Sequence, residues 1–302
     1  MWFWLSIAAL ICWSGSDLFS KIGCKGADDK LSHLKMVTAV GVVMGLHCAY
    51  EVFIGGTTLN MQVILTYLPV SALYIGSMAI GYLGLRYIEL SISSPICNSS
   101  GALVAVLTLI TAGRGEVNSA QLAAVALVCV GVIALGIVEA TEDPELRLAR
   151  QQKGNNVYTK SFLALLLPVV YCLLDALGTF ADSLVLETLD ENSANAAYEL
   201  TFFVVGILCL LYTTLIRRDR LVVRRELPKY IGACFETVGQ FAYIFAIGDS
   251  DHVMLAAPII SSYCVASVLW SRIFLKERLS WKHYAAIALV VTGIVIIGIY
   301  DV

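Results

Sequence analysis

The sequence predicts an all-α membrane protein with ten transmembrane helices, arranged as two inverted five-helix repeats around a central cavity. Three observations lead to this fold class: the composition, the length of the apolar segments and the similarity between the two halves. Of the 302 residues, 59% are hydrophobic and 14% are charged. Soluble domains contain roughly 45–50% apolar and about 25% charged residues. An apolar excess of this size indicates that most of the chain lies within a bilayer.

Ten apolar segments are long enough to cross a membrane, which takes about 20 helical residues each. They lie roughly at 1–22, 36–54, 66–88, 91–112, 120–140, 161–187, 195–216, 230–248, 252–274 and 281–300. Because the connections between them are short, little of the chain remains for a soluble domain. We therefore expect a multi-pass integral protein of the cell membrane, whether plasma or inner membrane.

Lysine and arginine are distributed unequally between the two sides of the predicted membrane. With these ten spans, all of the 20 Lys and Arg residues except Arg114 fall on one side. Short loops rich in Lys and Arg remain in the cytoplasm. We therefore expect both termini to be extracytoplasmic. The agreement of all ten spans with this bias also supports the span count.

The two halves of the chain resemble each other in layout. Pro95 and Pro258 each lie near the start of a helix and precede serine-rich sequence, and Gly131 corresponds to Gly293 in the helix that follows. Because each repeat holds an odd number of helices, the second repeat inserts with the opposite orientation. Such inverted repeats place a substrate site near the middle of the membrane, between the halves. The expected domains are a first repeat at 1–140, a cytoplasmic linker at 141–160 and a second repeat at 161–302.

Three stretches carry information about the family: WSGSD in the first predicted helix, LRYIELSISSPI leading into the fourth, and FLKERLSWKHYAAIALVVTGIVII at the end. This pattern resembles the drug/metabolite transporter superfamily, in particular proteins with two EamA-type domains, over nearly the whole chain. The resemblance implies a transporter of small metabolites in which helices 1–4 and 6–9 surround a cavity that helices 5 and 10 support. It also favours export. Many members are drawn with both termini in the cytoplasm, whereas the charge distribution here favours the opposite.

Acidic residues inside apolar segments are the first candidates for a functional site, because a charge in a membrane span is costly unless it faces a cavity or a partner. Asp17 and Asp175 occupy matching positions in the first helix of each repeat, and Trp13 and Tyr171 precede them by four residues. Residues four apart share one face of a helix, and an aromatic ring beside a carboxylate suits an ammonium group. We therefore expect these residues to bind substrate, with pairing of Asp17 to Lys21 as the alternative.

Further polar residues extend the predicted site. A carboxyl group in an apolar segment, such as Glu236, can exchange a proton for a cation, or it can bond to a neighbouring helix. His47 and Glu51 lie four residues apart on one helix face and are further candidates for proton coupling, alongside Asp17, Asp175 and Glu236, although a plain interfacial ion pair is favoured for them. The remaining predicted substrate-binding residues are Tyr74, Asn98, Ser262 and Tyr263, although helix packing is favoured for the serine. Lys35, Asp182 and Glu199 are expected near the water boundary.

Other features of the sequence argue against several classes of function. The nine cysteines are dispersed without a C-x-x-C pair, which is unlike a disulfide framework or a zinc site. No Lys or Arg lies deep in a predicted span, which disfavours substrates that carry phosphate. Motifs for nucleotide hydrolysis, metal-dependent or serine hydrolysis and cofactor binding are absent from the sequence. We therefore expect neither an enzyme nor a protein that needs a metal or cofactor.

The function predicted from the sequence is secondary active transport of a small organic cation or zwitterion, such as an amine or an amino acid. Coupling to protons and alternating access are expected. The expected partners are a small-molecule substrate and membrane lipid, with no nucleic acid, and the sequence does not distinguish a monomer from a homodimer. The alternative is a membrane component that transports nothing itself, such as a translocation subunit for lipid-linked intermediates or a scaffold.

Overall fold

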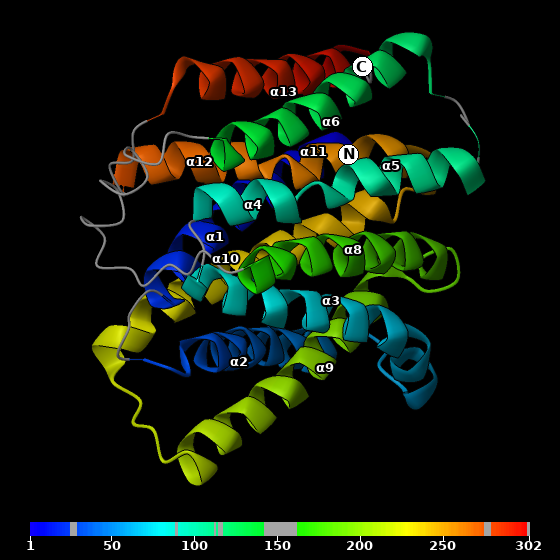
Figure 1. Ribbon diagram of the computed structural model, residues 1–302. Coiled ribbons are helices and arrows are strands. Elements are labelled where there is room, and N and C mark those ends of the chain that lie inside the picture. Colours follow the sequence, from blue (N-terminus) through cyan, green and yellow to red (C-terminus); the bar gives the residue numbers. More distant parts are fainter. Residues whose placement is uncertain are drawn as a thin grey trace.

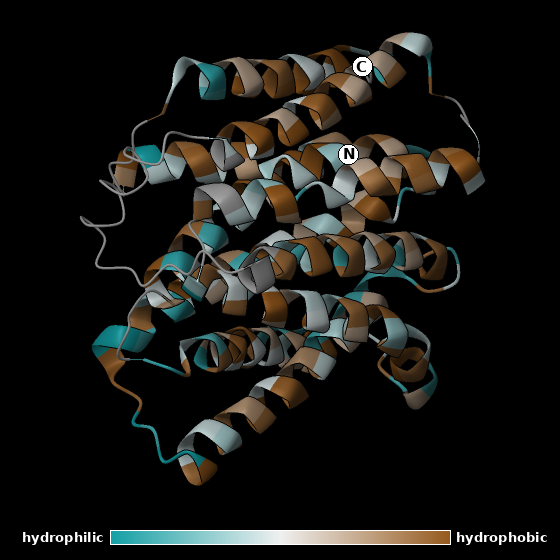
Figure 2. Ribbon diagram, viewed as in Figure 1, coloured by the Kyte–Doolittle hydropathy of each residue, from teal (hydrophilic) through white to brown (hydrophobic). Residues whose placement is uncertain are grey.

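The computed structural model describes residues 1–24, 29–87, 90–111, 113, 117–141, 162–274 and 279–300. Within these ranges the regular secondary structure is helical, and ten helical segments are long and apolar enough to cross a membrane, as the sequence predicts. Figure 1 shows them as roughly aligned helices, and Figure 2 shows hydrophilic residues gathering near helix ends and connections. The chain is a multi-pass integral membrane protein. The predicted linker, except its first residue, lies outside the described residues.

The spans of the first half are α1 (Trp2–Cys24), α2 (Ser32–Phe53), α3 (Met61–Tyr87), the pair α4 (Leu90–Cys97) and α5 (Ser100–Thr111), and α6 (Ser119–Ala140). The spans of the second half are α8 (Phe162–Val185), α9 (Glu191–Leu211) with the π-helical turn η1 (Tyr212–Ile216), α10 (Val223–Ile247), the 3-10 turn η2 (Ser250–His252) with the pair α11 (Val253–Ser261) and α12 (Tyr263–Phe274), and α13 (Trp281–Tyr300). The predicted spans differ from these at their ends. For example, α10 begins at Val223 and not at residue 230, because its charged first turns continue the helix beyond the apolar segment.

Helices of the first half pack mainly against helices of the second half. The most extensive contacts join α1 to α10, α2 to α9, α3 to α8 and α6 to α13. In Figure 1, α6 and α13 lie together at one edge of the bundle, α2 and α9 lie near the opposite edge, and the other spans lie between them. The middle of the molecule is therefore built from both halves of the chain.

Some close contacts recur at corresponding positions of the two halves. A Cβ atom at Gly131 of α6 would lie 2.5 Å from the side chain of Val290 on α13, and one at Gly293 of α13 would lie 2.7 Å from the side chain of Val128 on α6. The two glycines thus let α6 and α13 approach closely in a reciprocal way. A two-fold relation between the halves would produce such contacts, although the inverted repeat itself stays a prediction.

The interface between α2 and α9 contains a point of backbone contact. A Cβ atom at Gly41 would lie 2.6 Å from the carbonyl oxygen of Phe202 and 2.9 Å from the Cα atom of Gly206. We expect Gly41→Ala to destabilise the protein by about 1–3 kcal/mol, the usual cost of overpacking, because backbone atoms cannot rotate aside. Thermal unfolding in detergent measures this. Gly76→Ala is the control, since a Cβ there meets nothing within 4 Å; equal unfolding temperatures for the two variants would contradict the contact.

The fourth and ninth spans are each interrupted within the bundle. The interruptions separate α4 from α5 and α11 from α12, and a proline, Pro95 or Pro258, lies in the last part of the preceding helix. Proline removes a backbone donor and crowds the preceding turn, which weakens a helix at that point. The two spans cross closely, because a Cβ atom at Gly101 would lie 2.8 Å from the carbonyl oxygen of Ala257. Interrupted helices of this kind are typical of substrate sites in transporters.

A network of charged side chains joins the two halves at one end of the bundle. Lys35 Nζ lies 3.1 Å from Asp29 Oδ1 and 3.0 Å from Asp219 Oδ2. Lys229 Nζ lies 2.9 Å from Glu226 Oε2 and 3.6 Å from Asp29 Oδ2. Lys35 was expected at the water boundary; at this end of the bundle its side chain is covered by protein, with only 4% of its surface exposed. Acidic residues from the loop ahead of α2 and from the second half surround it.

Candidate functional site

A pocket lies between the two halves, with about 910 Å³ of space free of atoms when its opening is included. Its described lining comes from α1, α3, α4, α8, α9, α10, α11 and α12. All of the predicted substrate-binding residues except Ser262 are part of this lining: Trp13, Asp17, Tyr74, Asn98, Tyr171, Asp175, Glu236 and Tyr263. The structure thus gathers side chains that are far apart in the sequence around one space.

The pocket reaches towards one end of the bundle and stops short of the other. Ser20, Leu85 and Leu90 line it close to the end of α1, the end of α3 and the start of α4. These helix ends lie on the side of the predicted membrane where all Lys and Arg residues except Arg114 fall. On the opposite side the lining ends at Tyr74, more than three turns from the start of α3, and at Tyr243, one turn from the end of α10. Along α1, α3 and α4 the pocket therefore extends towards the basic end of the bundle.

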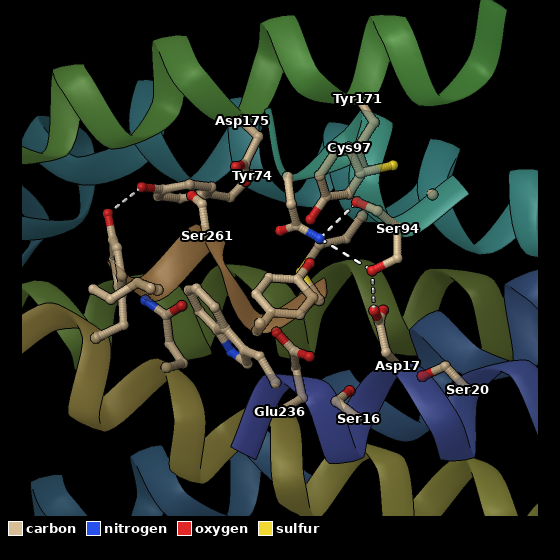
Figure 3. Close-up of a pocket in the computed structure, with 18 of the residues that line it drawn as sticks. Ser16, Asp17, Ser20, Tyr74, Ser94, Cys97, Tyr171, Asp175, Glu236 and Ser261 are labelled. Carbon is tan, nitrogen blue, oxygen red and sulfur yellow. Dashed lines mark hydrogen bonds between the residues drawn. The ribbon is translucent and has the colours of Figure 1, made fainter. Parts of the chain in front are cut away.

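Asp17 receives hydrogen bonds from both interrupted spans. The hydroxyl groups of Ser94 on α4 and Ser267 on α12 donate to Asp17 Oδ2 at 2.6 Å and 2.8 Å. Asn98 donates from Nδ2 to Ser94, at 2.7 Å to its carbonyl oxygen and at 3.1 Å to its Oγ, which orients that serine (Figure 3). Lys21, the alternative partner for Asp17, donates instead to the carbonyl oxygen of Leu85 at 2.9 Å.

Asp175 and Glu236 approach the same space from other helices. Ser100 Oγ on α5 donates to Asp175 Oδ2 at 2.7 Å, so the carboxylates of Asp17 and Asp175 both accept from hydroxyl groups of the interrupted fourth span. Glu236 extends from α10, with Ser16 of α1 beside it (Figure 3). The three acidic side chains therefore enter the pocket from α1, α8 and α10.

The ionisable carboxyl groups of the pocket have no basic side chain among them. Of the described residues that line it, none is Lys, Arg or His, whereas Asp17, Asp175 and Glu236 are acidic. Serine hydroxyl groups offset part of the charge by hydrogen bonding but carry no charge themselves. Burying an ionised group without a counter-charge is costly, so this lining favours the binding of a cation or of protons.

Aromatic rings of the pocket lining pack against glycines of facing helices. A Cβ atom at Gly239 would lie 2.5 Å from the ring of Trp13, and one at Gly81 would lie 2.8 Å from the ring of Tyr171. The absent side chains let these rings lie against the backbone of α10 and α3. The centroid of the Tyr263 ring is 5.8 Å from that of Trp13. Both rings are therefore packed against the backbone of a facing helix.

Some hydrogen-bond donors in the pocket lining have no partner. Gln240 Nε2, Tyr82 Oη and Ser20 Oγ are buried and make no hydrogen bond within the described part of the chain. Unpaired buried donors are unfavourable. A ligand or water in the pocket can satisfy them.

Comparison with known proteins identifies the family. Residues 162–299 match the EamA-like transporter family. The second half of the chain is therefore an EamA-like transporter domain. This family is part of the drug/metabolite transporter superfamily that the sequence resembles, so the protein is a membrane transporter of that type. The match covers the second predicted repeat, and the assignment of the first half as a second EamA-type domain stays a prediction.

Solved structures resemble this EamA-like transporter along its whole length. Twenty-eight chains of solved structures match. One of them, a crystal structure described only as that of a protein, has a TM-score of 0.65 and 14% sequence identity, and the match covers 98% of this chain and 95% of that chain. At this identity the likeness concerns the fold alone. No curated protein sequence matches the chain.

Ser262 of the EamA-like transporter is not placed as predicted. Its side chain is buried at the interruption between α11 and α12, where its Oγ donates to the carbonyl oxygen of Ile259 at 2.5 Å. The neighbouring Ser261 lines the pocket instead. Which of two adjacent serines faces the pocket depends on the turn between the two helices, and the sequence does not reveal that turn.

His47 and Glu51 lie away from the pocket lining, at the contact between α2 and α9. His47 Nδ1 is 2.9 Å from both carboxylate oxygens of Glu199, whereas His47 Nε2 is 3.8 Å from Glu51 Oε1. Glu199 was expected at the water boundary and is instead fully buried. The closer partner of His47 is thus on the other half of the transporter, and a role of this group in proton coupling stays a prediction.

Other residues of the EamA-like transporter that line the pocket or bond to its aspartates were missed from sequence. Ser94, Ser100 and Ser267 bind the aspartates, but serine is common at ordinary helix contacts in membranes, so no sequence signal separates them from packing residues. Gln240 follows Glu236 by four residues and therefore shares its helix face. That spacing was a usable signal. Tyr243 gave no comparable signal.

Proposed function

We propose that this EamA-like transporter carries a small organic cation or zwitterion by secondary active transport. The observation that carries the proposal is the charge of the pocket: three acidic residues line it, and none of the other described lining residues is a cation. An ammonium group supplies the missing positive charge. The rings of Trp13 and Tyr171 add cation–π attraction, which is worth about 0.5–2 kcal/mol depending on desolvation.

The unpaired donors of the pocket extend the substrate class from simple amines to amino acids. Gln240 Nε2 and Tyr82 Oη lack partners, and both can donate to the carboxylate of a zwitterion. A phosphate group would carry more negative charge into a pocket that already holds Asp17, Asp175 and Glu236. Nucleotide sugars and sugar phosphates are therefore poor candidates.

Proton coupling follows from the acidic lining. A carboxyl group binds a proton or a cation but not both at full strength, so the two ligands displace each other. Because the pocket lies between the halves, a rocking motion of one half against the other exposes it to alternate sides. Along α1, α3 and α4 the pocket lining extends towards the end of the bundle that the positive-inside rule assigns to the cytoplasm. Loading from the cytoplasm corresponds to export.

A thermal-shift screen of the purified protein with amines, amino acids and nucleotide sugars tests this proposal. A ligand at about 100 times its Kd stabilises the folded state by about 2.7 kcal/mol. We expect amines or amino acids to raise the unfolding temperature, less so in Asp17→Asn, and nucleotide sugars to have no effect. Glu187→Gln removes an acidic side chain that is exposed and outside the pocket, and this control should behave as wild type.

Two outcomes would contradict the proposal. Stabilisation by nucleotide sugars but not by amines would show that the acidic lining does not select the substrate. Stabilisation only by lipid-linked compounds would favour the alternative of a membrane component that carries no small solute.

A further inference from the structure

A fourth acidic side chain is buried behind the closed end of the pocket. Asp182 on α8 has no exposed surface and is not part of the pocket lining. The Tyr67 hydroxyl on α3 donates to Asp182 Oδ1 at 2.7 Å. The other carboxylate oxygen, Oδ2, has no hydrogen-bond partner among the described residues. The expectation that Asp182 lies at the outer interface is therefore wrong, because tyrosines of neighbouring helices cover it.

Three hydroxyl groups lie between Asp182 and the pocket. The Tyr74 hydroxyl donates to Thr179 Oγ1 at 3.0 Å and forms a short hydrogen bond with the Tyr243 hydroxyl (Figure 3). Tyr74, Thr179 and Tyr243 all line the pocket. The hydroxyl groups of Tyr74 and Tyr243 also neighbour the Asp182 carboxyl group. A row of exchangeable hydroxyl protons thus extends from the buried acid to the pocket.

The row is set by the spacing of residues on two packed helices. Thr179 precedes Asp182 by one helical turn on α8, and Tyr67 precedes Tyr74 by two turns on α3, so each pair shares a helix face. Because α3 packs against α8, the two faces meet. Tyr243 of α10 adds the remaining hydroxyl group of the row.

The titratable groups near Asp182 on the other helices carry hydroxyl groups but no positive charge. They are the hydroxyl groups of Tyr67 and Tyr74 on α3, Tyr198 on α9 and Tyr243 on α10. Asp175 lies two turns earlier on α8. Of the other helices that pack on α8, α5 contributes no titratable side chain and α4 only a cysteine. An ionised carboxylate is costly in such surroundings, whereas a bound proton removes its charge.

We propose that Asp182 is a proton-binding site of the transport cycle, separate from the carboxylates that bind the substrate, and that the hydroxyl groups of Tyr74, Tyr243 and Thr179 carry its proton to and from the pocket. This inference rests on the proposed proton-coupled function. A hydroxyl group both donates and accepts a hydrogen bond. The proton of Asp182 therefore bonds to a tyrosine oxygen as that hydroxyl releases its own proton to the next acceptor. The net result is an Asp182 carboxylate and one proton in the pocket.

The site also links proton binding to the position of the halves. Tyr67 and Tyr74 belong to the first half, whereas Thr179, Asp182 and Tyr243 belong to the second, so each hydrogen bond between these two groups spans the interface. Loss of the proton leaves an uncompensated charge on Asp182, among the packed side chains of α3, α8 and α10. Separation of α3 from α8 and α10 then becomes favourable, because it admits water to the carboxylate. Protonation of Asp182 favours the packed arrangement of these helices that the structure shows.

The first test needs no substrate. Infrared spectroscopy of the purified transporter at neutral pH reports protonated carboxyl groups directly. We expect a protonated-carboxyl band in the wild type that Asp182→Asn lacks and that Tyr67→Phe shifts in frequency, since it loses the hydrogen bond to Oδ1. In Tyr243→Phe the band should remain, but its exchange with deuterium from the solvent should slow. An unchanged protonated-carboxyl region in both Asp182→Asn and Tyr67→Phe would overturn the proposal. If Asp182→Asn fails to fold, the Tyr67→Phe shift decides.

The second test separates this site from the substrate site. In proteoliposomes, Asp182→Asn should retain amine-for-amine exchange at equal pH on both sides but lose the extra flux that a pH gradient drives. Gradient-driven flux equal to that of the wild type would overturn the assignment. If the wild type carries no amine at all, the proposed function fails, and the infrared result still decides whether Asp182 binds a proton.

Discussion

Replacement of Asp175 with asparagine is expected to abolish transport of the organic cation driven by a pH gradient and to weaken cation binding strongly. Removing one partner of a buried charge pair costs about 2–5 kcal/mol. At about 1.4 kcal/mol per factor of ten, this corresponds to a roughly 30-fold to several-thousand-fold weaker affinity. Asparagine keeps the size of the side chain, and its carbonyl oxygen can still accept from Ser100 Oγ, which lies 2.7 Å from the carboxylate. The substitution thus removes the charge while preserving the local packing.

Uptake of a labelled amine into proteoliposomes measures the flux, and calorimetric titration measures the affinity. Glu187→Gln is the matched control, because it removes the same charge from an exposed position of the connection that follows α8. Flux and affinity unchanged in Asp175→Asn would remove this residue from the mechanism. Normal affinity together with lost gradient-driven flux would assign Asp175 to proton coupling and not to substrate binding.

The spans and the acidic residues of the pocket could be predicted because both follow from the properties of the bilayer. Each span requires a stretch of apolar residues, and such a stretch can be recognised without knowing which helices surround it. An aspartate within such a stretch requires a cavity or a partner, whichever helices surround it. Asp17 and Asp175 were recognised in this way, and the four-residue spacing identified the aromatic residue beside each.

The hydrogen-bond partners of these aspartates could not be predicted in the same way. Ser94, Ser100 and Ser267 come from other helices, and their contacts depend on how the interrupted spans are placed in the bundle. The single-residue turn at Ser262 shows the same limit, since it decides which of two serines faces the pocket. Local sequence reports the period of a helix but not its rotation relative to its neighbours.

Depth along a helix was a poor guide to burial for other charged residues. Lys35, Asp182 and Glu199 lie near the ends of their spans and were therefore expected near water. Each is instead covered by side chains of the opposite half, and none has more than 4% of its surface exposed. Glu199 is covered at the contact of α9 with α2, Asp182 at the contact of α8 with α3, and Lys35 by acidic residues that include Asp219 and Glu226 of the second half. Such contacts between distant segments are not visible in one segment alone.

Lys35→Met is expected to destabilise the folded transporter by about 3 kcal/mol. Breaking a buried ion pair by removing one partner costs about 3–5 kcal/mol, because the remaining charge stays buried without compensation. The Lys35 side chain is 4% exposed and the Asp29 side chain 10%, but the Asp219 side chain is 35% exposed. Water therefore screens part of the lost interaction, which places the effect at the lower end of that range.

Denaturant unfolding in detergent measures this loss, and Lys30→Met provides the control, since Lys30 carries the same side chain in an exposed position near α2. Because the cost arises from acidic side chains left unpaired, neutralising one of them should recover part of it. We expect Lys35→Met combined with Asp29→Asn to be more stable than Lys35→Met alone. Lys229 then continues to pair with Glu226, at 2.9 Å, without a second acid competing for it. A double variant less stable than the single one would show that Lys35 acts through the packing of its aliphatic chain and not through its charge, and that the network does not bind the two halves electrostatically.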